Sequence, residues 1–76
     1  MTEIEWLNFF GDNLTRMMYE YKLTQRDLSD MTGLSEATIS KYVGKRQMPG
    51  IKAILNISYA LGCSADDLID FGAAIK

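Results

Sequence analysis

Apolar positions in the first third of the chain recur with the period of an α-helix and predict a helix over about residues 3–21. The residues on its inner face follow at steps of four, three and four: Phe10, Leu14, Met17 and Tyr21. Thr2 precedes this run with Glu5 three residues later, the spacing of a capping box. Gly11 interrupts the pattern and marks where a kink would fall. Trp6 and Phe9 either wrap over the C-terminal helix or form an interface, and the first is favoured.

Two short helical patterns follow, one on either side of Gly33, the natural residue for a left-handed turn after a helix. Thr24 can cap the first, with Asp27 at capping-box spacing, and Ser35 can cap the second, which Gly44 ends. The residues expected to point inward are Leu28, Met31, Leu34, Ile39 and Tyr42, with Val43 as a further candidate. What faces outward on the second helix is small and polar, which suits entry into a groove.

The most apolar segment comes next and predicts a central helix over about residues 51–61, capped by Gly50. Its predicted inward stripe comprises Ile51, Ile54, Leu55, Ser58 and Leu61. Ser64 and Asp67 form another capping box for a short helix at 65–70. Leu68 and Phe71 are expected to pack inward from it. No stretch alternates with period two, so the predicted fold is all-α, a compact bundle of about five helices.

Length and composition indicate a single small domain. The 76 residues suffice for one domain over 1–76, and 47% hydrophobic residues can fill its core. No apolar run approaches the roughly 20 residues that cross a bilayer. Glu3 and Glu5 stand where a signal peptide would be basic, so no export is expected. A single cysteine, Cys63, and the absence of histidine predict a reduced, cytoplasmic protein held by packing, with Cys63 in the core.

Enzymatic and metal-binding functions find little support in the residues. There is no histidine, no glycine-rich phosphate loop and no paired catalytic carboxylate, so we expect no enzyme and no cofactor. Asp66, Asp67 and Asp70 are interpreted as caps and solvated surface of a short helix, because no chelating loop accompanies them.

The net charge of −2 disfavours nucleic acid when taken alone, but the charge is unevenly distributed. Residues 22–52 hold six cations and three anions, a net of +3, whereas the remainder holds two cations and seven anions, a net of −5. The positive segment contains the two short helices and the loop after them. Ordinary solvated surface explains the charges alone equally well.

Two separated runs resemble the lambda-repressor/Cro-type helix-turn-helix family of transcriptional regulators. The first extends from Leu23 to Tyr42 and contains the helix-turn-helix at 24–43, and the second extends from Pro49 to Leu68. The resemblance implies a five-helix domain that binds operator DNA, usually as a two-fold dimer. It further implies a DNA-binding set, which is Gln25, Ser35, Glu36, Ala37, Thr38, Ser40, Lys41, Lys45 and Arg46.

Individual roles within this set follow from the resemblance and from the chemistry of each side chain. Gln25 would hold a phosphate at a helix N-terminus, where backbone N–H groups favour anions. Glu36 would accept a hydrogen bond from a cytosine amino group, or else stabilise the N-terminus of its own helix. Ala37 would touch a thymine methyl, or simply let the helix approach. Lys45 and Arg46 would clamp the DNA backbone.

Three departures from the family pattern stand out. The glycine that usually follows the recognition helix lies one place later in the family, where this chain has Lys45, and Lys22 replaces a glycine after the first helix. At both turns, therefore, the backbone path can differ from that of the family. Met18 and Val43 replace an arginine–glutamate pair, and we hypothesise that they touch and fix the recognition helix by packing.

The function predicted from these residues is a DNA-binding transcriptional regulator, prophage-like or bacterial, that represses by occupying operator double-stranded DNA. Helix 36–43 would enter the major groove, and a homodimer would supply affinity, with no role for a membrane. The dimer surface is placed on Ile69, Phe71 and Ile75. The alternative is a protein-interaction module, an antitoxin or adaptor, on the same fold.

Overall fold

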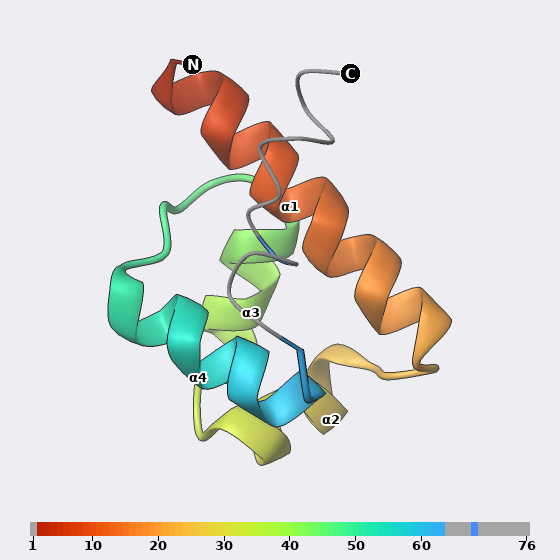
Figure 1. Ribbon diagram of the computed structural model, residues 1–76. Helices are drawn as coiled ribbons and strands as arrows, with labels where there is room; N and C mark the ends of the chain where they lie inside the picture. Colours follow the sequence, from red (N-terminus) through yellow and green to blue (C-terminus); the bar gives the residue numbers. More distant parts are fainter. Residues whose placement is uncertain (1, 64–67, 69–76) are drawn as a thin grey trace.

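Four helices make up the part of the chain that the structure describes, residues 2–63 and 68 of a computed structural model. They are α1 (Glu3–Glu20), α2 (Gln25–Thr32), α3 (Glu36–Val43) and α4 (Ile51–Leu61). The long α1 runs along one side, and the three shorter helices gather against it (Figure 1). The described residues contain no strand, which confirms the all-α prediction. None of these helices combines the length and apolar character that crossing a membrane would require.

α1 begins where the sequence predicts, because the Thr2 hydroxyl accepts the backbone N–H of Glu5 at 3.2 Å. The helix passes Gly11 without interruption. The prediction that Tyr21 lies in the core is wrong, since Tyr21 is the exposed residue at which the helix ends. Met18 is buried instead, one turn earlier.

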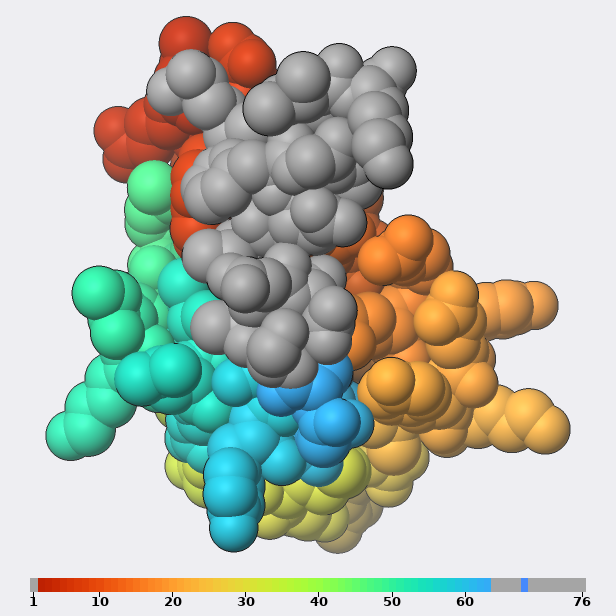
Figure 2. Space-filling model, viewed as in Figure 1, coloured from red at the N-terminus to blue at the C-terminus, as the bar shows by residue number. Residues whose placement is uncertain are grey.

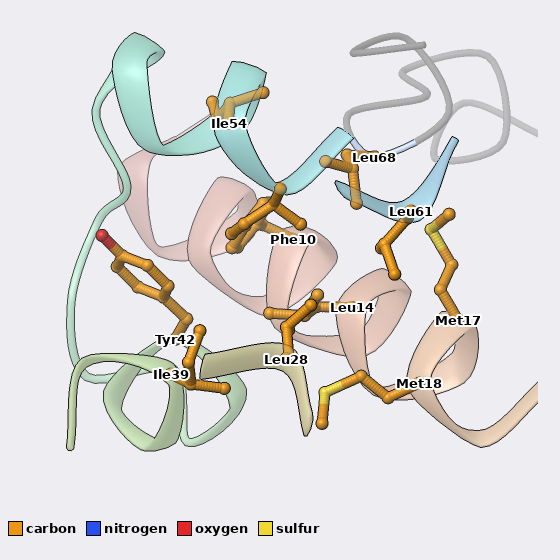
Figure 3. Packing of buried hydrophobic residues seen from close by; sticks show 11 residues of the cluster. Phe10, Leu14, Met17, Met18, Leu28, Ile39, Tyr42, Ile54, Leu61 and Leu68 are labelled. Atoms are coloured by element: carbon orange, nitrogen blue, oxygen red, sulfur yellow. The ribbon is translucent and has the colours of Figure 1, made fainter. Parts of the chain in front are cut away.

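The core lies between α1 and the three shorter helices (Figure 3). Its fully buried large side chains are Phe10, Leu14, Leu28, Ile39, Ile57 and Leu68. The rings of Trp6 and Phe10 stack with centroids 5.6 Å apart, and Tyr42 meets Phe10 edge-on at 5.9 Å. Trp6 is thus half-buried against the core, and this aromatic column joins α1 to α3.

Three further residues predicted to point inward lie at the surface instead. Met31 is 47% exposed, because the short α2 buries only Leu28 and Thr32. Ile51 and Leu55 are 77% and 54% exposed. The buried side of α4 is formed by Ile54, Ile57, Ser58 and Leu61. The apolar stripe of α4 is therefore wider than the face that the fold covers.

The predicted fifth helix at 65–70 lies outside the described residues except for Leu68. The predicted cap at Ser64 and Asp67, the aspartates Asp66 and Asp70, and the dimer residues Ile69, Phe71 and Ile75 lie outside them as well. Leu68 is fully buried, as predicted, and its carbonyl accepts the side-chain amide of Asn13 at 2.9 Å. Asn13 is itself buried, so this bond satisfies a polar group in the core.

Candidate nucleic-acid interface

A complete capping box opens α2. The Thr24 hydroxyl accepts the backbone N–H of Asp27 at 3.0 Å, and the Asp27 carboxylate accepts the backbone N–H of Thr24 at 2.9 Å. The backbone N–H of Thr24, followed by the Thr24 hydroxyl, stabilises the ionised carboxylate and lowers the pKa of Asp27 below its ordinary value of 3.8. Gln25 is the half-buried first residue of the helix. The N–H groups of Gln25 and Arg26 precede any intrahelical acceptor and are thus available to an anion.

The turn between α2 and α3 is held by side chains from both sides. Gly33 takes φ 78°, the left-handed conformation that the sequence predicts there. The Thr32 hydroxyl donates to the carbonyl of Leu28 at 2.8 Å and accepts the N–H of Leu34 at 3.1 Å. Asn56 of α4 donates to the carbonyl of Thr32 at 2.7 Å. The angle between α2 and α3 therefore rests on hydrogen bonds as well as on the core.

α3 divides into a buried and an exposed side. Ile39 and Tyr42 are buried in the core, and Val43 packs against it, as does the buried Met18 of α1. A direct contact between Met18 and Val43 remains a hypothesis. The opposite side consists of residues predicted to bind DNA. Of these, Ser35, Glu36, Ala37 and Lys41 are exposed, and Thr38 and Ser40 are half-buried.

Ser35 serves as the helix cap, since its hydroxyl accepts the N–H of Thr38 at 3.1 Å and donates to the Thr38 hydroxyl at 2.9 Å. Both hydroxyl groups are thereby partnered within the protein. The exposed Glu36, which directly follows the cap, forms no side-chain hydrogen bond or ion pair with the other described residues.

Lys45 folds back toward α1 and pairs there with an acidic side chain at the surface. Its ammonium nitrogen lies 2.7 Å from the Asp12 carboxylate of α1. Its stem crosses Gly11, where a Cβ atom would stand 2.7 Å from Lys45 Cγ and 3.1 Å from the carbonyl oxygen of Tyr42. Gly11 is therefore needed for close approach between α1 and the end of α3. The helical pattern of the sequence predicts only a possible kink at Gly11 and gives no signal for Asp12.

Arg46 turns back over the last turn of α3. Its guanidinium donates to the Ser40 hydroxyl at a long 3.4 Å, and its backbone N–H donates to the carbonyl of Lys41 at 2.8 Å. The guanidinium also lies beside Gly44, where a Cβ would be 3.2 Å from Arg46 Nε. Arg46 thus shares one exposed surface with Ser40.

Two lysines hold backbone conformations that favour glycine. Lys22 has φ 58° and Lys45 has φ 61°, whereas Gly44 has an ordinary φ of −79°. The positions where this chain departs from the family pattern therefore keep the left-handed turn that a glycine would adopt. The departures change the residue and leave the local backbone turn in place.

The α2–α3 unit therefore combines three features. These are a capped N-terminus on α2, a polar outer side on α3 and the Arg46 side chain beside it. Of the predicted site residues, those of α3 share one side and Arg46 joins them, while Lys45 is directed toward α1.

Comparison with known proteins agrees with this geometry. A protein-family model described as the Cro/C1-type HTH DNA-binding domain matches residues 13–73. The SPbeta prophage-derived uncharacterized HTH-type transcriptional regulator YotL of Bacillus subtilis (strain 168) is 38% identical over 72% of this chain and 70% of that protein. The uncharacterized HTH-type transcriptional regulator YqaE of the same organism is 34% identical over 79% of this chain. This chain spans 52% of YqaE.

A solved structure shares the fold. An HTH_3 family transcriptional regulator from Vibrio cholerae superposes with a TM-score of 0.89 over 97% of this chain, at 16% sequence identity. The match covers 42% of that longer chain. At this identity the likeness establishes the arrangement of helices alone.

Proposed function

Because this chain belongs to the Cro/C1-type helix-turn-helix DNA-binding family, a family of transcriptional regulators, we propose that it acts as a repressor that occupies operator DNA. The observation that carries this proposal is the two-sided character of α3. Ile39 and Tyr42 anchor one side in the core, and the other side carries mainly polar side chains with no bulky apolar residue. The major groove of DNA, about 12 Å wide, admits such a helix.

In the proposed complex, α3 lies in the major groove and α2 crosses the backbone. Glu36 and Ala37 at the start of α3 contact base edges, and Thr38, Ser40 and Lys41 contact bases or phosphates. Gln25 holds a phosphate together with the N–H groups at the start of α2.

The remaining proposed contacts come from Ser35 and from the loop after α3. Ser35 orients the first turn of α3, and Arg46 binds a backbone phosphate. Lys45 reaches a phosphate only if it leaves Asp12, since the two are paired in the structure.

A chain of this size buries little DNA, so we place two copies on half-sites about 10 bp apart. The protein would work in the cytoplasm as one domain over residues 1–76, without cofactor or catalytic activity. The family match favours this function over an antitoxin or adaptor module.

Selection of bound sequences from random DNA tests the function most directly. We expect one enriched motif, arranged as a palindrome. Binding to that motif should weaken steeply as salt rises, because phosphate contacts release counterions. The absence of any enriched motif, or an affinity independent of salt, would refute the proposed function.

Variants then locate the interface. Lys41→Ala with Arg46→Ala removes two cations of the proposed interface. The slope of log affinity against log salt should become shallower by about 0.9 when Lys41 contacts a base, and by about 1.8 when both side chains contact phosphates. Arg16→Ala removes a cation from α1 and is the matched control, with a slope near that of the wild type. Unchanged DNA binding in the double variant would show that the docking is wrong.

A further inference from the structure

An exposed apolar row runs along α4. Ile51, Leu55 and Tyr59 follow at four-residue steps and are 77%, 54% and 89% exposed. The opposite side of the same helix is buried in the core. Figure 2 shows α4, coloured cyan to blue, at the molecular surface. None of the three residues belongs to the proposed DNA-binding set, so the row needs another explanation.

The charges on α4 are as unusual as its apolar surface. Lys52 is the only charged residue among the eleven of the helix. It lies in the first turn, where a cation opposes the helix dipole, while the last turn carries no basic residue. A cation would be favourable at that last turn. Lys52 thus interacts unfavourably with the dipole of its own helix, whereas it would interact favourably with the dipole of an antiparallel second α4.

We infer that α4 pairs with α4 of a second copy of this chain, antiparallel and across a two-fold axis near Leu55. In this register Leu55 faces its own counterpart, and Ile51 packs against Tyr59 of the second copy. Such an isologous contact uses the same row twice and closes at the dimer.

Charge complementarity selects a second copy as the occupant. The antiparallel register brings Lys52 beside the exposed ring of Tyr59 and the C-terminal, negative end of the other α4 dipole. The helix dipoles are antiparallel as well.

This inference deepens the proposed function and rests on it in one respect, because the dimer explains how two α3 helices reach adjacent half-sites. The contact itself involves no DNA. It can therefore be tested on the protein alone.

Sedimentation equilibrium of the whole chain over a range of concentrations tests the pairing. We expect a monomer–dimer equilibrium. Tyr59→Ser should raise the dissociation constant about tenfold, equivalent to about 1.4 kcal/mol. Tyr19→Ser is the matched control, since Tyr19 is 85% exposed on α1, and it should leave the constant unchanged. Circular dichroism verifies that both variants fold.

A charge exchange tests the register. Lys52→Glu and Tyr59→Lys should each weaken the dimer, and the combination should restore it through a salt bridge between the two copies. Positions 52 and 59 are seven residues apart and do not contact each other within one helix. Rescue therefore requires the antiparallel pairing.

A monomer at every concentration, equal effects of Tyr59→Ser and Tyr19→Ser, or no rescue in the double variant would overturn the inference. Binding to a DNA half-site separates this outcome from failure of the proposed function. Tyr59→Ser should keep half-site binding although it loses the dimer. An intact dimer that binds no DNA would refute the proposed function and leave the α4 contact standing.

Discussion

The ammonium group of Lys45 lies 2.7 Å from Oδ1 of Asp12 and ties the loop after α3 to α1. The pair is at the surface, with the Asp12 side chain 71% exposed, so its contribution to stability is small. The pair matters because it sets where Lys45 points. It turns this cation, which follows α3, away from the surface proposed to contact phosphates.

Asp12→Asn should therefore release Lys45 toward DNA. One added phosphate contact would make the slope of log affinity against log salt steeper by about 0.9. The free energy of unfolding should fall by only about 0.2–1 kcal/mol. Glu20→Gln removes the same charge from the same helix and is the control for a general electrostatic effect. If both variants bind DNA alike, Asp12 does not restrain Lys45.

Gly11→Ala should destabilise the protein although alanine favours helices. The added Cβ would stand 2.7 Å from Lys45 Cγ and 3.1 Å from a backbone oxygen. Overpacking costs about 1–3 kcal/mol against a gain of about 1 kcal/mol in helix propensity, so we expect a net loss of up to about 2 kcal/mol. Urea unfolding measures the net loss. When Lys45 is also replaced by alanine, Gly11→Ala should reduce the free energy of unfolding by less. A loss of the same size would show that the clash is with the Tyr42 carbonyl.

Lys22→Gly should stabilise the fold. Relief of the left-handed conformation at φ 58° is worth about 1–2 kcal/mol, against about 0.5–1 kcal/mol of added chain entropy in the unfolded state. The thermal midpoint should rise accordingly. Lys22→Ala, which keeps a Cβ, should not raise it, and a rise equal to that of the glycine variant would disprove the role of φ.

Asp27 should make stability depend on acid pH. Its folded-state pKa is lowered, so its contribution is complete above the unfolded pKa and disappears as pH falls through the folded value. Denaturant midpoints from neutral to strongly acid pH should therefore decline less steeply for Asp27→Asn than for wild type. Asp30→Asn on the same helix is the control, and parallel curves for all three proteins would contradict the prediction.

Glu36 should determine one base of the operator. If its carboxylate accepts from a cytosine amino group, Glu36→Ala relaxes the preference at that position by about 1–3 kcal/mol in repeated selections. Where Glu36 only stabilises its own helix, the motif stays the same and the thermal midpoint falls instead. The two measurements distinguish the two roles.

Local signals in the chain identified most of the secondary structure. Thr2, Thr24 and Ser35 cap helices as predicted, and Gly33 holds the expected left-handed turn. These features depend on residues within four positions of one another, and so they can be predicted from the sequence alone. The outward side of α3 was predicted for the same reason.

Burial was harder to predict at the margins of each helix. Met31, Ile51 and Leu55 continue apolar stripes, yet they are exposed because no neighbouring helix reaches them. Periodicity gives the direction of a stripe, and only the packed neighbours determine its width.

The sequence by itself determined the all-α class, the positions of the helix caps and the helix-turn-helix, because short-range propensities and capping bonds specify them. The tertiary structure decided where Lys45 points, why residue 11 is a glycine and which apolar side of α4 remains uncovered. Those features arise where segments distant in the chain meet: Asp12 with Lys45, Gly11 with Tyr42, and Asn13 with Leu68. Contacts of this kind leave no local pattern, since each partner alone is compatible with many surroundings.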